Sequence, residues 1–347
     1  MNHMLNEIRQ QPDVVRNILE NEIHNVEALA AEIKRRNIAY AYVAARGTSA
    51  NAATYCKYLL EIQHGIPVAI AAPSVFTVYE ALPHLGDNAL VIGISQSGEA
   101  PDVTAVVKHA RSTGALTACI TNTPGSQLAQ ASEHTLNIGA GEEVGIAATK
   151  TYTGTLACLA LLSTALDPEH PERIEHLRRC AKAIEASLGL DEAIHMLVER
   201  YKDMQGCIVI GRGYNQCTAM DTAHKITETS NIAAQAYGAA GFQHGAIAQV
   251  QKGFPVILYA PEGRTFRAMA DLADKLRGQH PALICISHDA LFLAGSETAI
   301  RVPMAVQEWV SPIVYAVAGQ LIAYWVSLSK GLDPDTPRGI EKVTKTV

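Results

Sequence analysis

Short apolar segments alternate with longer amphipathic segments along the first half of the chain. Residues 39–45, 67–72, 88–95 and 116–121 are short apolar runs, whereas 48–65 and 101–114 have the spacing of polar and apolar residues that helices show. Strands that are buried on both faces of a parallel sheet read as near-continuous apolar runs, and helices connect them. The pattern therefore predicts an α/β fold.

The same order of segments returns in the second half of the chain. The stretch "GCIVIGRGYNQCTAMDTAHKITET" resembles "YAYVAARGTSANAATYCKYLLEI", and the spacing agrees: Gly47 and Gly213 are 166 residues apart, as are Cys119 and Cys285. A nearly constant offset indicates a duplicated domain. We expect two doubly wound, flavodoxin-like parallel-sheet domains. The predicted parts are an N-terminal helical arm (1–34), a first domain (35–168), a helical connector (169–203), a second domain (204–332) and a polar tail (333–347).

Composition narrows the classes of partner and compartment. The net charge is −6 and the pI about 6.1, which argues against nucleic acid or an anionic membrane as the main partner. The apolar stretch 311–331 is interrupted by Gln320 and by several serines, so we expect a buried core helix and no membrane span. Seven scattered cysteines without a CxxC pair and an N-terminus without a signal-peptide pattern predict free, buried thiols in a cytoplasmic protein.

The stretch "GISQSGEAPDV", residues 93–103, places small hydrogen-bonding side chains between a predicted strand and a predicted helix. Backbone N–H groups at the start of a helix favour an anion, and the hydroxyl and carboxamide groups of Ser95, Gln96 and Ser97 add donors. The preceding strand ends similarly, at Thr48 and Ser49, and neighbouring strand ends of an open sheet can converge on one ligand. The pattern predicts a phosphate monoester site.

Helix capping is the alternative explanation, because serine is an ordinary N-cap residue. The second copy has "APEG" where the first has Ser95 to Gly98, and it therefore lacks the hydroxyls. Serines that served only the fold should occur in both copies, so their absence from one favours a ligand in the other. Nucleotide motifs are weak: there is no GxxxxGK[ST], and "GRG" at 211–213 lacks the third glycine of the dinucleotide fingerprint.

A second group of polar residues lies in "MDTAHKITETSN". Asp221, Lys225 and Glu228 have the spacing i, i+4 and i+7 and so share one face of a helix, either as catalytic groups or as a solvated ion-pair stripe. His244 lies in the glycine-rich stretch 236–250, where a structural role is the simpler explanation. The other twelve histidines have no metal-ligand spacing, so we propose no metal site. Lys342 lies in the polar tail, which by default is frayed.

These stretches together resemble the sugar isomerase (SIS) family over essentially the whole chain. The matching segments include "RGTSANAA", "ISQSGEAPDV", "EEVGIAATKTYTGTL", "MDTAHKITETSNIAAQAYGAAGFQHGAIA" and "DPDTPRGIEKVT". The resemblance is closest to the isomerase half of glucosamine-6-phosphate synthase and to stand-alone glucosamine-6-phosphate deaminases of the SIS type.

The resemblance implies a role for each candidate residue. Thr48, Ser49, Ser95, Gln96 and Ser97 would hold the phosphate of the sugar. Glu228 would move a proton between C1 and C2, Lys225 would stabilise the developing negative charge on oxygen, and Asp221 would lie nearby. His244, from the second subunit of a homodimer, would help to open the sugar ring, and Lys342 would form an imine with a ketose. No nicotinamide, metal or pyridoxal cofactor is implied.

The sequence also departs from the synthase. Ala100 and Ala148 stand where the synthase has hydroxyl residues, and no glutamine amidotransferase domain precedes the matching region, so we expect no use of glutamine as an ammonia source. We expect a deaminase that converts glucosamine 6-phosphate to fructose 6-phosphate and ammonia. The alternatives are an aldose–ketose phosphosugar isomerase, a fructosamine-type deglycase, and a sugar-phosphate sensor without catalysis.

Overall fold

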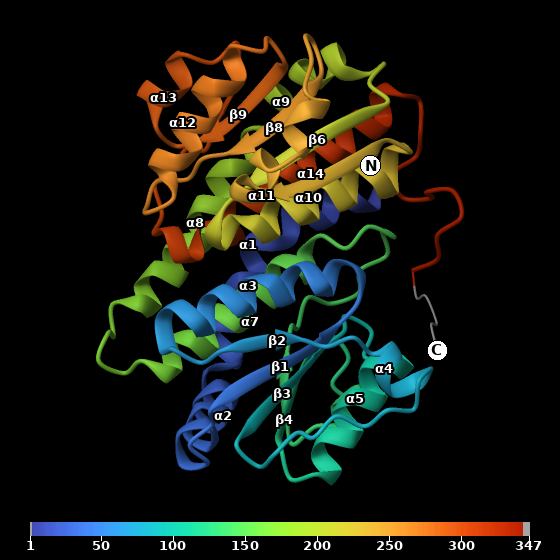
Figure 1. Ribbon diagram of the computed structural model, residues 1–347, viewed down its shortest axis with the longest axis vertical. Helices are drawn as coiled ribbons and strands as arrows, with labels where there is room; N and C mark the ends of the chain where they lie inside the picture. The colour runs from blue at the N-terminus through green and yellow to red at the C-terminus, as the bar shows by residue number, and fades with distance from the viewer. Residues whose placement is uncertain (1, 343–347) are drawn as a thin grey trace. The chain divides into compact units, whose positions relative to one another are not determined.

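The computed structural model describes residues 2–342 and contains two units, each built on its own five-stranded parallel sheet (Figure 1). Within the described residues, the first sheet unit consists of residues 13–143, 150–178 and 341–342, and the second of residues 2–12, 144–149 and 179–340. Helices α1 (His3–Asn21) and α8 (Arg173–Leu188) have residues in both units. Residues 343–347 of the predicted tail lie outside the described part of the chain.

The first sheet unit has the strand order β2-β1-β3-β4-β5. Its strands are β1 (Tyr40–Ala45), β2 (Val68–Ile70), β3 (Ala89–Ile94), β4 (Leu116–Thr121) and β5 (His134–Asn137). The strands are parallel, and the register pairs Ala45 at the end of β1 with Ile94 at the end of β3. Consequently the two segments that follow these strands leave the sheet side by side.

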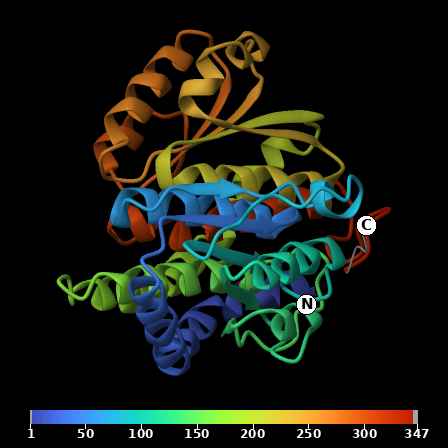
Figure 2. The same cartoon turned by 60° about the horizontal axis from the view of Figure 1, so that its bottom comes forward.

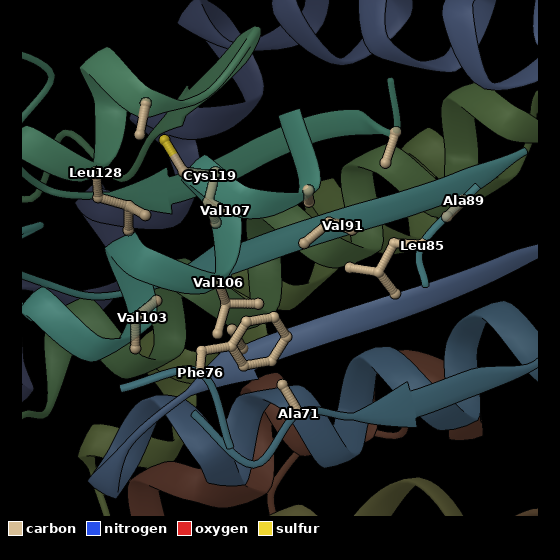
Figure 3. Close-up of a cluster of buried hydrophobic side chains, with 14 of the residues drawn as sticks. Ala71, Phe76, Leu85, Ala89, Val91, Val103, Val106, Val107, Cys119 and Leu128 are labelled. Carbon is tan, nitrogen blue, oxygen red and sulfur yellow. The ribbon is translucent and has the colours of Figure 1, made fainter. Parts of the chain in front are cut away.

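Helices cover both faces of this sheet (Figure 1). One face packs against α2 (Ile23–Arg35), α3 (Gly47–His64) and α7 (Lys150–Leu166), and the other against α4 (Ser74–Thr77), α5 (Pro101–Ser112) and α6 (Gln127–Ala131). Figure 3 shows the second of these interfaces, where Val103, Val106 and Val107 of α5 meet Phe76 and Val91. Covering on both faces explains why every residue of β3 and β4 is buried and why the two strands are largely apolar, as the sequence predicts.

The second sheet unit has the order β10-β9-β8-β6-β7. Its strands are β6 (Gly206–Gly211), β7 (Ala233–Gly238), β8 (Pro255–Tyr259), β9 (Ala282–Ser287) and β10 (Thr298–Arg301). Helices α11 (Ala239–Gln243), α12 (Phe266–Arg277) and α13 (Ala290–Ala294) cover one face, with α12 and α13 drawn in orange (Figures 1 and 2). The remaining helical elements are α9 (Asp191–Val198), α10 (Gln216–Ser230), α14 (Ser311–Ser329), η1 (Glu199–Tyr201), η2 (Gly213–Asn215), η3 (Ala246–Gln249) and η4 (Glu308–Val310).

The two strand orders are the same when the second sheet is read from β7, which confirms the predicted duplication. Gly47 and Gly213 follow the corresponding strands β1 and β6, and both have positive φ, +50° and +59°. Glycine adopts this conformation without the steric cost that other residues incur. The repeated glycines therefore mark a turn that both copies need.

Helix α14 is the apolar segment that the sequence predicts to be a core helix. Among the described residues, one segment, Glu308–Ser329, is long and apolar enough to cross a membrane, and 94% of its most apolar 18-residue window is buried inside the structure. It packs against α9 and α10 of the same unit. This burial confirms the prediction of a core helix. All seven cysteines are buried thiols that form no disulfide, again as predicted.

Candidate functional site

Two neighbouring turns at the carboxyl edge of the first sheet hold the predicted phosphate-binding residues. Thr48 and Ser49 lie in the first turn of α3, directly after β1, and Ser95, Gln96 and Ser97 lie between β3 and α5. Ser95 is buried, and the other four side chains are half-buried. Because Ala45 and Ile94 are partners in the sheet, the structure places both turns at adjacent strand ends.

Internal hydrogen bonds fix the shape of the 95–98 turn. The backbone N–H of Gly98 donates to the carbonyl and to the Oγ of Ser95, both at 3.2 Å, and the Oγ of Ser97 accepts from the N–H of Glu99. Gly98 has a φ of +67°, and a Cβ there would lie 2.0 Å from the Oγ of Ser126. Glycine is thus required at this position for its backbone conformation and for the close approach of Ser126.

Arg46 and Asp102 connect these two turns, a contact that the sequence analysis did not foresee. The Nε of Arg46, the residue before Gly47, donates to the Oδ2 of Asp102 at 2.6 Å. Asp102 lies in the first turn of α5 and is fully buried, whereas 47% of the Arg46 side chain is exposed. The contact brings a guanidinium beside a serine-rich turn that has no lysine or arginine of its own. Arginine is well suited to phosphate because its planar group donates several hydrogen bonds.

Helix α10 of the second sheet unit holds the other predicted catalytic group. Its orientation is fixed against α14: the Oγ of Ser327 donates to the Thr229 carbonyl at 2.7 Å. The hydroxyls of Thr222 and Tyr259 are 2.7 Å apart, and a Cβ on Gly319 of α14 would lie 2.0 Å from the Oγ1 of Thr222. The small residue in α14 therefore allows the two helices to pack closely.

The structure brings Asp221, Lys225 and Glu228 together on one face of α10, as their spacing predicts. The Nζ of Lys225 lies 3.4 Å from the Oδ1 of Asp221 and 3.3 Å from the Oε2 of Glu228. Lys225 and Asp221 are buried, and 15% of the Glu228 side chain is exposed. The Nε2 of His224, a residue that sequence analysis missed, lies 3.1 Å from the Oε1 of Glu228. His224 and Glu228 have the spacing i, i+4, and this spacing was the sequence pattern from which their contact could have been predicted.

The pKa values of the two carboxyl groups in this cluster, those of Asp221 and Glu228, are shifted in opposite directions. Burial raises the pKa of Glu228, but the Lys225 ammonium and the contacts with His224 lower it more, and the resulting pKa is about 2. Burial raises the pKa of Asp221, and the opposing effect of Lys225 does not overcome it. Glu228 is therefore a deprotonated carboxylate at neutral pH, as a general base must be. Carboxyl groups with opposite shifts are a frequent feature of catalytic sites.

His244 and Lys342 belong to other segments of the described chain than α10. His244 is exposed and follows α11 directly. Lys342 belongs to the first sheet unit, where its Nζ lies 2.9 Å from the Oε2 of Glu143. Glu143 is fully buried and also accepts hydrogen bonds from the N–H and Oγ1 of Thr151 at 3.1 and 2.7 Å. This part of the predicted tail is thus bound to a buried carboxylate.

Comparisons with known proteins agree with this architecture. The SIS domain model matches residues 35–165 and 203–330. An isomerizing glutamine–fructose-6-phosphate aminotransferase of Thermococcus kodakarensis is 33% identical over 98% of this chain. The chain spans 57% of the length of that relative, and the same share of the corresponding protein of Aquifex aeolicus, which is 31% identical.

Solved structures show the same fold. The C-terminal domain of glucosamine-fructose-6-phosphate aminotransferase from Francisella tularensis has a TM-score of 0.89 at 25% identity and covers 97% of this chain and 98% of its own. A glucosamine-6-phosphate deaminase from Thermotoga maritima has a TM-score of 0.79 at 22% identity, covering 99% of this chain and 100% of its own, a likeness of fold alone. With both copies matched by the family model and relatives aligned along nearly its whole length, the chain belongs to the SIS domain family.

Proposed function

We propose that the protein is an enzyme that moves a proton between C1 and C2 of an amino-sugar 6-phosphate, and that its reaction converts glucosamine 6-phosphate to fructose 6-phosphate and ammonia. The observation that carries this proposal is the buried Lys225–Glu228 pair on α10, with Glu228 kept deprotonated by its surroundings. Membership of the SIS family and relatives named for fructose 6-phosphate support the class of substrate.

The first sheet unit provides the groups that would bind the phosphate. Thr48, Ser49, Ser95, Gln96 and Ser97 lie at adjacent strand ends and offer hydroxyl, carboxamide and backbone donors. Phosphate is remote from the reacting carbons of the sugar, so these contacts serve binding and orientation rather than the proton transfer. A sugar without phosphate is therefore expected to be a much poorer substrate.

The second sheet unit provides the groups for the chemistry. In the open-chain sugar the aldehyde makes the proton on C2 acidic, and the Glu228 carboxylate removes it. The negative charge that develops on the C1 oxygen is stabilised by the Lys225 ammonium, while Asp221 holds Lys225. Glu228 then returns the proton to C1, the C1 oxygen gains a proton and becomes a hydroxyl, and the nitrogen on C2 gives up one proton, which leaves an imine at C2. Water hydrolyses this imine to the ketone of fructose 6-phosphate and releases ammonia.

Two further residues have proposed roles on either side of this proton transfer. His244, exposed after α11, would assist opening of the sugar ring as a residue supplied by the second subunit of a homodimer. Lys342 would form an imine with a ketose, after release from Glu143. The protein would act in the cytoplasm and without a dissociable cofactor. Aldose–ketose isomerisation and deglycation share the same proton transfer and form the second candidate reactions.

The decisive measurement is ammonia release from glucosamine 6-phosphate by the purified protein in the absence of glutamine. Replacing the base, as in Glu228→Gln, should lower the rate by about 10²–10⁴-fold, because general base catalysis contributes about that much. Glu192→Gln is a matched control, since Glu192 is an exposed glutamate on α9 of the same unit. In D2O, deuterium should be found at C1 of the product if Glu228 exchanges with solvent.

Each outcome separates the candidate reactions. Isomerisation of a sugar phosphate without ammonia release would replace the deaminase by the isomerase, and release of an amine from a fructosamine phosphate would favour the deglycase. Turnover that Glu228→Gln leaves unchanged would contradict the role of Glu228. Binding of a sugar phosphate without any turnover would identify a sensor.

A further inference from the structure

The turn between β8 and α12 in the second sheet unit corresponds to the 95–98 turn of the first. Both turns follow the middle strand of a sheet, both contain a glycine with positive φ, Gly98 and Gly263, and both lead into a twelve-residue helix. The second turn lacks the serines. The backbone donors at the start of α12 must therefore find another partner.

The carboxylate of Glu308 occupies this position. Its Oε2 accepts from the backbone N–H of Arg264 at 2.8 Å, and its Oε1 accepts from the N–H of Thr265 at 3.1 Å and from the Oγ1 of Thr265 at 2.7 Å. Two backbone N–H groups, one hydroxyl and the positive end of a helix together form the same set of donors that binds phosphate at helix N-termini.

Gly263 is adapted to this carboxylate. Its φ is +142°, and a Cβ there would lie 2.4 Å from the Cδ and 2.5 Å from the Oε2 of Glu308. Any side chain at position 263 would therefore displace the carboxylate. Thr265 supplies the hydroxyl from the residue that precedes α12, whereas Ala100, the residue that precedes α5, has none.

The first copy has no such carboxylate at the corresponding distance from its last helix. Glu308 lies three residues before the start of α14, and the residue three before the start of α7 is Ala147. A methyl group cannot accept a hydrogen bond. The second copy therefore has a carboxylate of its own at this position, Glu308, whereas the first copy has Ala147 and no anion there.

We propose that the start of α12 is a second oxyanion site, which the protein keeps filled with its own Glu308 carboxylate, and that a small oxyanion such as inorganic phosphate binds there when this carboxylate is removed. The duplicated fold then has two oxyanion sites of the same type, one open to ligand and one closed by the chain. A consequence is that the native protein binds no phosphate at the second site. The contacts of Glu308 alone support this inference, so it does not depend on the reaction proposed above.

The probe is inorganic phosphate, titrated calorimetrically into the full chain. Ser95→Ala/Ser97→Ala is the parent, because it weakens phosphate binding by the first copy. Adding Glu308→Ala should increase the stoichiometry by one phosphate per chain and should raise the Tm with phosphate but not with chloride at matched ionic strength. Glu308→Gln in the same parent is the matched control, since its amide fills the site and should give no additional phosphate.

Thr265→Val provides a further check on the location of the added phosphate. In the Glu308→Ala protein it removes the hydroxyl donor, and the affinity for the added phosphate should fall by roughly tenfold, corresponding to about 1.4 kcal/mol for one lost hydrogen bond. The proposal is wrong if the folded Glu308→Ala protein binds no more phosphate than its parent, or if that protein stays unfolded at every phosphate concentration. If the first copy binds no phosphate, the difference in phosphate binding between the Glu308→Ala protein and its parent can still be measured.

Discussion

Arg46 and Asp102 form an ion pair, 2.6 Å between Nε and Oδ2, that links the turn after β1 to the first turn of the helix after β3. The two residues are 56 positions apart in the sequence, yet each adjoins one of the two turns with the phosphate-binding candidates. The second copy has Arg212 before Gly213 but Arg267 at the position that corresponds to Asp102. The pair thus exists in the copy that has the serine-rich turn.

Replacing Arg46 should destabilise the protein more than removing both partners. Arg46→Ala leaves the fully buried Asp102 carboxylate without this guanidinium, at an expected cost on the order of 2 kcal/mol, below the about 3–5 kcal/mol for fully buried pairs because Arg46 is half exposed. The double variant Arg46→Ala/Asp102→Asn has no such charge and should lose less. Urea denaturation measures both. If both variants lose the same unfolding free energy, Arg46 does not compensate the cost of burying the Asp102 charge.

The same variants should affect substrate binding. If the ion pair holds the two turns in register, Arg46→Ala should raise KM for the sugar phosphate by roughly tenfold or more and change kcat little, since phosphate contacts contribute to binding in both the ground and the transition state. Arg46→Lys keeps a charge but loses the planar group, so it should restore KM only in part. An unchanged KM in Arg46→Ala would exclude this positioning role.

Acid should destabilise the protein partly through Glu228. Its pKa is lowered from 4.5 to about 2 in the folded state, so its ionised form stabilises the fold above about pH 4.5, and this contribution is lost as the pH falls towards 2. The full effect is on the order of 3 kcal/mol. The difference in unfolding free energy between the native protein and Glu228→Gln should therefore shrink over this range. Parallel pH curves for the two proteins would contradict the shift.

Asp221 provides a contrast on the same helix. Burial raises its pKa above 3.8, so its ionised form costs stability above that pH, the reverse of Glu228. Asp221→Asn should therefore destabilise the protein less at neutral pH than Glu228→Gln does. Thermal unfolding at pH 7 compares the two. A larger loss for Asp221→Asn would show that its contact with Lys225 outweighs the cost of burying its charge.

The sequence predicted the central strands because they are buried on both faces and therefore mostly apolar. It predicted the long helices because their apolar residues recur with the helical period. Of the four edge strands, β2 was predicted from the apolar run 67–72, whereas β5, β7 and β10 were missed, since an edge strand is paired on one side and does not need a continuous apolar run. Segment β7, "AAQAYG", is half-exposed along most of its length, and its polar and glycine residues concealed it.

The contacts of the candidate site also fall into two groups, those that could be predicted from the sequence and those that could not. Asp221, Lys225 and Glu228 could be grouped from sequence because helix geometry fixes the positions of neighbours three or four residues apart. The contacts of Asp102 with Arg46, of Glu308 with Thr265 and of Lys342 with Glu143 span 56, 43 and 199 residues. Such contacts depend on how strands and turns are arranged in space, and no local pattern indicates them.

Gly98→Ala should disrupt the serine-rich turn. The left-handed backbone costs a non-glycine residue about 1–2 kcal/mol, and the new Cβ would lie 2.0 Å from the Oγ of Ser126. Gly125→Ala is the matched control, because no atom lies within 4 Å of its Cβ position, and a change below about 0.5 kcal/mol is expected. Combining Gly98→Ala with Ser126→Gly should recover the part of the loss that comes from the clash. Chemical denaturation measures the unfolding free energy of each variant. If Ser126→Gly recovers none of the loss, the whole loss comes from the left-handed backbone.

Lys342 can be tested for covalent chemistry separately from its contact with Glu143. An imine forms when the neutral amine attacks the ketone of fructose 6-phosphate and water leaves, and borohydride reduces the C=N bond to a stable secondary amine. Lys342→Arg keeps a cation for the buried Glu143 carboxylate but has no amine that can form this imine. Mass spectrometry should find the reduced adduct on Lys342 of the native protein and none at position 342 of the variant. An unmodified Lys342 in the native protein would leave the contact with Glu143, which anchors this segment, as the role of this residue.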